Sequence, residues 1–158
     1  MGFFDAVQSA NGSVWLAHLL FIPAYMLLGT AKHEYAHAIA AKRQGLTVTR
    51  IQLFPHIRDG NFYWGYVSWT GAVVADSGTY MAPYIVDAIL LALGSLVIWL
   101  FVPMAWWIEN SHVFFVTTII GLILPIFDIG YNFMKWRFRK SGDFWEVFGK
   151  VKRFGGVL

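Results

Sequence analysis

The sequence predicts an all-α membrane protein with three transmembrane helices, a β-hairpin on the cytoplasmic side and a C-terminal amphipathic helix on the membrane surface. Composition is the first reason: apolar residues make up 58% of the chain, aromatic residues 18% and charged residues only 13%. A soluble domain has about a quarter of its residues charged. A soluble chain of this composition would expose large apolar patches and aggregate, so lipid is the expected solvent.

The second reason is the length of the apolar segments, because a helix needs about 20 residues to cross a bilayer. We expect spans at about residues 14–41, 81–108 and 113–134. No internal repeat or low-complexity tract divides the chain, so residues 1–158 are expected to form a single membrane-embedded domain.

The third reason is the distribution of basic residues. All twelve Lys and Arg residues lie at or after Lys32, and the link between the second and third spans, residues 109–112, contains none. Basic residues favour the cytoplasmic flanks of spans. We therefore expect a multi-pass protein of the inner or plasma membrane with its C-terminus in the cytoplasm. No removable signal peptide is apparent, and no motif indicates nucleic-acid binding.

Residues 46–70 have a different character from the spans. Two stretches rich in Val, Ile, Thr, Tyr and Trp flank Arg58-Asp59-Gly60-Asn61, a turn signal that contains Asp-Gly. This pattern predicts a β-hairpin. Two roles stay open for it: a structural cap with interfacial aromatic residues, or an edge strand that pairs with an extended substrate.

Residues 143–154 place four apolar side chains on one helical face and charged residues elsewhere, which predicts the amphipathic surface helix. Its expected role is anchoring. Asp143 follows Ser141-Gly142 and is interpreted as the N-cap of this helix.

The chemistry is expected from His33-Glu34-Tyr35-Ala36-His37, which has the HExxH pattern inside the first span. Histidines four residues apart share one helical face and can bind one metal ion, while the adjacent Glu34 can act as general base toward a water. The chain has no cysteine, so the metal must be held by His and carboxylate, and Zn2+ is the expected ion. Ionisable groups at this depth are costly unless they face a cavity and a partner.

A third ligand is needed, and two carboxylates lie within the later spans. Asp87 is early in the second span and Asp128 is late in the third, both roughly level with the HExxH motif. Depth alone does not choose between them.

The HExxH motif in a transmembrane helix resembles that of the site-2 protease group of intramembrane zinc metalloproteases. In that family a later helix supplies an Asp ligand from a motif of the form Asn-x-x-Pro-x-Pro-x-Leu-Asp-Gly. Residues 122–130 of this chain keep one Pro, Pro125, and the Asp, Asp128, at the spacing of the motif's second Pro and its Asp, but have Phe127 before the Asp where the motif has Leu. The order of motif helix, β-rich segment, helix and Asp-bearing helix is also kept. The resemblance therefore implies Asp128 as third ligand, with Asp87 as the alternative.

Two further residues are expected around the site. Asn132 lies one helical turn after Asp128, where it can orient the carboxylate, donate to a substrate carbonyl or join two helices. Lys32 is the other deeply placed charge: it can pair with Asp128 or extend its ammonium toward the membrane surface.

These patterns predict a zinc metallopeptidase (HExxH type) that hydrolyses peptide bonds of membrane-tethered polypeptides near the cytoplasmic face. The partners expected are a membrane-protein or peptide substrate, the lipid bilayer, and a second copy or partner subunit, because three helices form a thin wall around a hydrated site. The main alternative is a catalytically inactive metal-binding scaffold or regulator. A di-iron oxidase, which would need more His-rich motifs, and a metal transporter are further alternatives.

Overall fold

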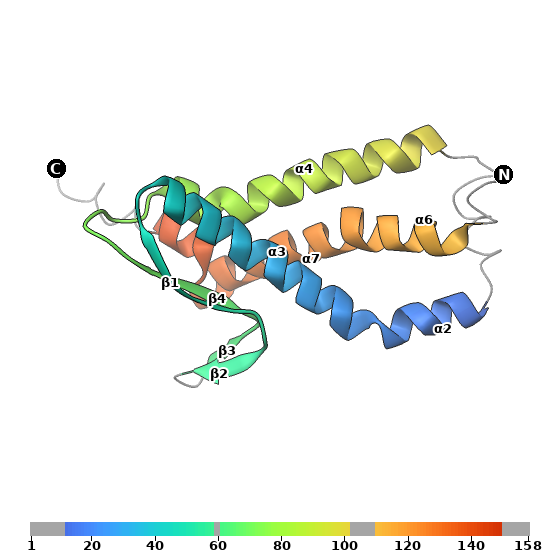
Figure 1. Ribbon diagram of the computed structural model, residues 1–158, viewed down its shortest axis with the longest axis horizontal. Coiled ribbons are helices and arrows are strands. Elements are labelled where there is room, and N and C mark those ends of the chain that lie inside the picture. Colours follow the sequence, from blue (N-terminus) through green and yellow to red (C-terminus); the bar gives the residue numbers. More distant parts are fainter. Residues whose placement is uncertain (1–11, 59–60, 102–109, 150–158) are drawn as a thin grey trace.

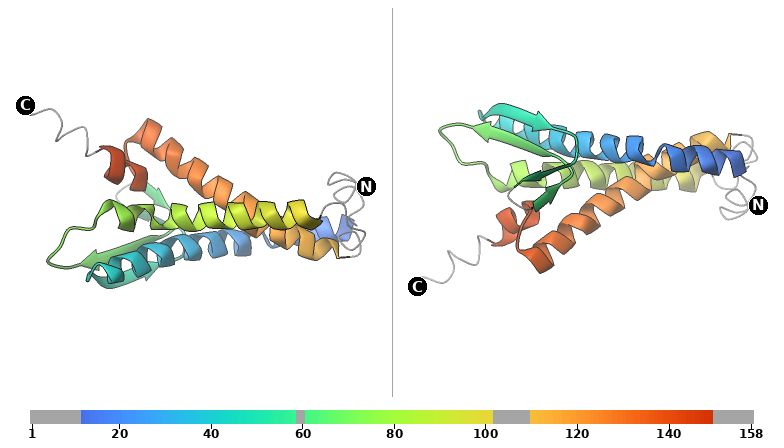
Figure 2. Two further views of the ribbon diagram at one scale, coloured as in Figure 1. Left: turned by 90° about the horizontal axis from the view of Figure 1, so that it is seen from above. Right: turned by 90° about the horizontal axis from the view of Figure 1, so that it is seen from below.

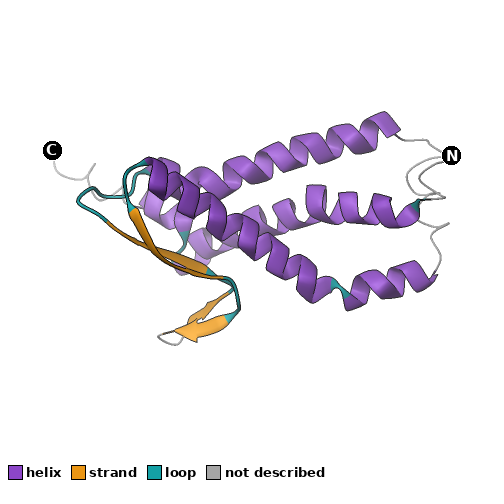
Figure 3. Cartoon of the chain, in the orientation of Figure 1, coloured by secondary structure: helices purple, strands orange, loops and turns teal. Residues whose placement is uncertain are grey.

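The computed structural model describes residues 12–58, 61–101 and 110–149. This part of the chain is mostly helical, with three long helical runs side by side and a small β region at one end (Figures 1 and 3). The expected arrangement of helices and hairpin is thus present, with differences in the details of each.

The first helical run consists of two helices, α2 (Gly12–Leu20) and α3 (Ile22–Arg43), separated at Phe21. The sequence predicted one continuous helix over residues 14–41, and this is corrected. The reason is Pro23 in the first turn of α3: a proline ring clashes with the carbonyl four residues earlier and lacks an amide donor, so it ends or kinks a preceding helix.

The second run is the single helix α4 (Ser77–Phe101). The third is helical without a break through α6 (Ser111–Thr118), the π-helical turn η1 (Ile119–Ile123), α7 (Leu124–Met134) and the π-helical turn η2 (Lys135–Arg139). Both runs begin before the spans predicted at 81–108 and 113–134. Residues 102–108 of the second predicted span lie outside the described residues.

Two helices are long and apolar enough to cross a membrane: residues Ser77–Leu100 and His112–Arg139. In each, only 22% of the most apolar window is buried inside the protein. A core helix of a soluble protein would be mostly buried, so these apolar surfaces indicate association with a membrane. In the first run, neither α2 nor α3 is both long enough and apolar enough to qualify in the same way.

The second and third runs approach closely where two glycines face each other. A side chain at Gly94 of α4 would lie within 3 Å of the backbone of Gly121 in η1. Small residues at such a crossing let two helix backbones touch, which is how helices associate in lipid. Beyond this crossing, α7 diverges from α3 and α4 (Figure 2).

The predicted hairpin is confirmed, but as two short sheets rather than one. Strand β1 (Thr47–Gln52) pairs antiparallel with β4 (Tyr66–Thr70), and β2 (His56–Arg58) pairs antiparallel with β3 (Asn61–Tyr63). Residues 59–60 of the predicted turn lie outside the described residues.

Gly65 holds the hairpin against α3. A Cβ atom at this position would lie 2.5 Å from Cγ2 of Thr30, 2.7 Å from the carbonyl oxygen of Gln52 and 3.0 Å from Cγ of Glu34. Only glycine allows this approach, so the hairpin backbone lies directly on the helix face that carries Glu34.

Several polar side chains are buried between the helices and the β region, whereas α4 exposes large apolar side chains along its length. The buried polar side chains are Glu34, His37, Thr79, Asp87 and Asn132. Large apolar side chains on α4 are exposed, and they include Ile85, Ile89, Leu93, Leu96, Trp99 and Leu100. Buried polar groups facing one another beneath an apolar exterior are typical of a functional site inside a membrane protein.

After η2 the chain reverses through two residues with left-handed backbone, Lys140 (φ 50°) and Gly142 (φ 84°). A new helical segment begins at Asp143, as predicted, and continues through the π-helical turn η3 (Trp145–Gly149). Its Phe144 packs on Tyr84 of α4 with ring centroids 4.3 Å apart. Residues 150–154 of the predicted surface helix lie outside the described residues.

Candidate metal centre

Helix α3 brings the two histidines of the HExxH motif together. The Nε2 atoms of His33 and His37 lie 3.1 Å apart, and the ring planes are nearly perpendicular, at 79°. Four residues make about one turn of helix, so this convergence follows from the spacing alone. The expectation that both imidazoles leave α3 from one face is confirmed.

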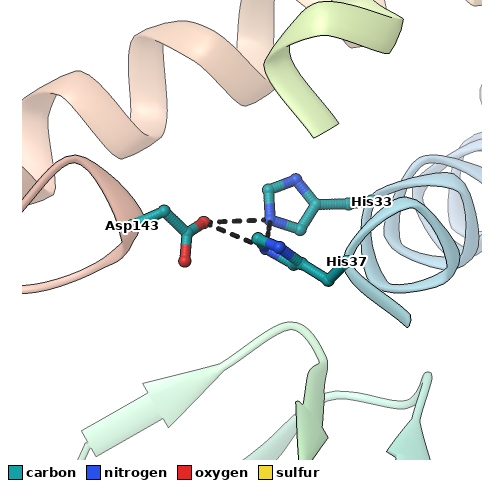
Figure 4. Close-up of side chains that lie close together, drawn as sticks. All are labelled: His33, His37 and Asp143. Carbon is teal, nitrogen blue, oxygen red and sulfur yellow. Dashed lines mark hydrogen bonds and ion pairs between the residues drawn. The ribbon is translucent and has the colours of Figure 1, made fainter. Parts of the chain in front are cut away.

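A third group, the carboxylate of Asp143, completes a triangle with the two histidines (Figure 4). Its Oδ2 atom lies 3.2 Å from Nε2 of His33 and 3.2 Å from Nε2 of His37. The Tyr84 hydroxyl donates to the same oxygen at 2.9 Å. Burial by itself would raise the pKa of Asp143, but its hydrogen bonds with His33 and His37 and their charge hold it well below its usual range. The carboxylate is therefore ionised.

The opposite ring nitrogens of both histidines have acceptors. Nδ1 of His37 donates to the carbonyl oxygen of Thr79 at 2.8 Å, and Nδ1 of His33 lies 2.7 Å from Oδ2 of Asp128. Thr79 is itself placed by Asp76, whose carboxylate accepts its amide N–H at 2.9 Å at the start of α4. When a metal takes the place of the protons on Nε2 and the remaining proton is on Nδ1, each imidazole would present the lone pair of Nε2 to the triangle.

Three acceptor atoms that face one another need a proton or a cation between them. The separations of 3.1, 3.2 and 3.2 Å suit a metal ion, because a tetrahedral zinc site with ligand bonds of about 2.05 Å has edges of about 3.3 Å. The donor set of two imidazoles and one carboxylate is also a known catalytic zinc set, which leaves one position open. The residues present therefore fit zinc.

Neither carboxylate that the sequence singled out as third ligand lies at this triangle. Asp128 is on the far side of the His33 ring, where Asn132 donates to its Oδ1 at 3.0 Å and to its backbone carbonyl at 3.1 Å. Asp87 forms an ion pair with Lys32. Asp128 thus contacts Nδ1 of His33, whereas Asp143 contacts Nε2 of the same ring.

The sequence interpretation of Asp143 as a helix N-cap came from its position after Ser141-Gly142. Its side chain turns instead to the two histidines, and the reversal at residues 140–142 carries it there. The one sequence signal was a carboxylate directly after a turn-forming glycine, close behind the last apolar helix. That signal does not distinguish a cap from a ligand.

Glu34 lies beside the triangle, only 7% exposed. It lines two hollows: one of about 90 Å³ between α3, α7 and residues 63–65, and one of about 1020 Å³ between α3, β4, the start of α4 and residues 139–146. His37 and Asp143 line the larger hollow and His33 the smaller. The Glu34 carboxylate thus lies beside the triangle and borders both hollows.

A scan against protein-family models finds no match, and searches of curated proteins and of solved structures find none either.

Proposed function

We propose that this protein is an intramembrane zinc metallopeptidase that hydrolyses peptide bonds of membrane-tethered polypeptides near the cytoplasmic face. The observation that carries the proposal is the triangle of His33 Nε2, His37 Nε2 and Asp143 Oδ2 beside the buried carboxylate of Glu34. In this proposal α3 is the third membrane-spanning helix, and the C-terminal segment lies in the cytoplasm.

The proposed division of labour follows from the side chains. Zinc, when bound by His33, His37 and Asp143, supplies a Lewis acid that polarises a peptide carbonyl and activates a water. Glu34 takes the proton from that water on its carboxylate and returns it to the leaving amine. Thr79 and Asp128 hold the two imidazoles in the orientation that the site requires.

The larger hollow suits an extended peptide. It is lined by Tyr66, Val67 and Trp69 of β4 on one side and by His37 and Asp143 on another. Within the described residues β4 pairs only with β1, so its other edge has no strand partner. An extended substrate can add to such an edge, and it must be extended because helical amides are engaged in their own hydrogen bonds.

Lys135 is proposed to hold the carbonyl of the cleaved bond. It lines both hollows together with Glu34, and its Nζ lies 5.7 Å from the Tyr63 ring and 5.4 Å from the Tyr131 ring. No described carboxylate forms an ion pair with it, which leaves its donors for a ligand. We expect Lys135→Met to lower kcat about a hundredfold, the usual effect of losing one such donor. Arg137→Met, an exposed neighbour that lines neither hollow, is the matched control. Equal kcat values for the two variants would remove Lys135 from the mechanism.

The proposal is tested by metal content and cleavage in detergent-purified protein. We expect about one zinc per chain, as in other His/carboxylate catalytic sites, and chelator-sensitive cleavage of a membrane-tethered peptide. Zinc should be lost in His33→Ala and His37→Ala. His18→Ala is the control, because His18 contacts Tyr25 at 2.6 Å on the far part of the first helical run and does not belong to the triangle.

The outcomes separate the candidates. Zinc with cleavage supports the peptidase, and absence of zinc after reconstitution contradicts any metal function at this site. Zinc without cleavage of unfolded or membrane-tethered peptides favours the metal-binding scaffold or regulator. Zinc flux into proteoliposomes that is unchanged by Glu34→Gln would indicate a transporter.

A further inference from the structure

Lys32 lies next to His33 in α3, and its ammonium joins three helices. It forms an ion pair with Asp87 of α4 and lies 3.5 Å from Oδ2 of Asp128 in α7. The side chains are largely or wholly buried, with exposed fractions of 17% for Lys32, 0% for Asp87 and 18% for Asp128. A lysine that extended to the membrane surface would not make these contacts.

Such a cluster is a poor way to gain stability. Removing charges from water costs more than their attraction commonly returns, and apolar residues of similar volume often replace a buried ion pair with no loss of stability. The cluster instead fixes the positions of its three side chains relative to one another, because each comes from a different helix.

Asp128 links this cluster to the metal-binding residues. Its Oδ2 atom lies 2.7 Å from Nδ1 of His33 and also faces the Lys32 ammonium, while Oδ1 accepts from Asn132. The carboxylate is therefore held from three directions, and the His33 ring follows its position. Among the described residues no other Lys or Arg pairs with Asp87 or Asp128. Without Lys32 the two carboxylates would have no cation between them and Asp128 would lose one of its three contacts.

We propose that Lys32 is a positioning residue of the metal centre: held by Asp87, it fixes the Asp128 carboxylate and through it the imidazole of His33. The inference depends on the proposed zinc site, and it assigns to an ion pair outside the ligand triangle an effect on metal affinity that acts through Asp128.

The test measures zinc affinity by competition with a chromophoric chelator. Partners that orient metal ligands change affinity by about 10- to 100-fold, so we expect about a hundredfold loss in Asp128→Asn and about a tenfold loss in Lys32→Met. Lys32→Arg, which keeps a cation, should recover part of the loss. Lys42→Met is the matched control, because Lys42 is exposed on the same helix. The Lys32→Met/Asp128→Asn double variant should bind zinc no more weakly than Asp128→Asn alone, because residues that act through one another are not additive.

A second variant guards against misfolding, since a single substitution leaves Asp87 buried without its partner. Lys32→Met/Asp87→Leu removes both charges, which a buried site tolerates better, and it should show the same tenfold loss within about a factor of three. The visible spectrum of the Co2+-substituted protein should change in this variant and stay as in wild type in Lys42→Met.

The two proposals fail in different ways. If wild type binds no zinc, the proposed function and this inference are both overturned. If wild type binds zinc but Lys32→Met/Asp87→Leu keeps its affinity within about twofold and its cobalt spectrum, where an orienting partner would cost about tenfold, only the positioning role is overturned. Additive losses in Lys32→Met and Asp128→Asn would likewise contradict an action of Lys32 through Asp128.

Discussion

Glu34→Gln is expected to abolish peptide cleavage, with kcat reduced by about a thousandfold or more, because an amide cannot take the proton of the attacking water. Zinc content should stay at the wild-type level, since Glu34 is not one of the three converging ligand groups. The substitution keeps the size of the side chain. Size matters here because the hairpin backbone at Gly65 lies close against Glu34: a Cβ atom, if residue 65 had one, would be 3.0 Å from Cγ of Glu34. Metal analysis and single-turnover cleavage of a tethered peptide measure the two quantities separately.

Glu146→Gln serves as the control for this experiment. Glu146 lines the same large hollow but does not belong to the ligand triangle. Cleavage by Glu34→Gln at the rate of Glu146→Gln would remove the general base from the proposal. Loss of zinc in Glu34→Gln alone would instead make Glu34 a ligand, and the proposed open position would then be occupied by protein.

Asp143→Asn and Asp128→Asn are expected to differ sharply, although each exchanges a carboxylate for an amide near His33. Asp143 lies at the Nε2 atoms of both histidines, so its loss should lower zinc affinity far beyond the roughly hundredfold effect expected for Asp128→Asn and leave the purified protein without metal. Asp128 lies at Nδ1 of His33, so its variant should bind zinc more weakly but fill the site at saturating zinc.

Zinc titration of the two variants decides between the expected ligand sets. If Asp128→Asn cannot be filled and Asp143→Asn can, the assignment that the family resemblance implies is right, and the side-chain triangle is not the metal site. Asp87→Asn is the third variant to titrate. The sequence left Asp87 open as a ligand, whereas in the structure its carboxylate forms an ion pair with Lys32. Loss of filling in Asp87→Asn alone would move the third ligand to α4.

The position of Asp143 has a consequence for how the site assembles. The two histidines come from the middle of a long helix, whereas Asp143 comes from the segment beyond the reversal at residues 140–142. Contacts of Tyr84 with Asp143 and Phe144 hold that segment on the start of α4. The proposed ligand set therefore depends on the packing of the C-terminal segment as well as on the helix bundle.

Several features of this protein follow from local sequence. The i, i+4 spacing of His33 and His37 places both imidazoles on one face of any helix, and the Asp-Gly turn signal predicted a hairpin, whose strands β2 and β3 pair antiparallel. The apolar composition predicted helices for lipid, and α4 and the third helical run have the length and composition for it. For the first run, the ionisable motif itself interrupts the apolar pattern, so membrane crossing by α3 stays a prediction.

The third member of the triangle was decided only by tertiary structure. Asp87, Asp128 and Asp143 are all carboxylates near one depth of the bundle, and local sequence cannot say which of them meets Nε2 rather than Nδ1 of His33. That choice depends on how α4 and α7 pack on α3, and on a chain reversal whose left-handed residues, Lys140 and Gly142, bring a distant segment back to the helix. Spacing along one helix is a local property. Which carboxylate meets each side of the His33 ring is set instead by the packing of α7 and of the C-terminal segment against α3.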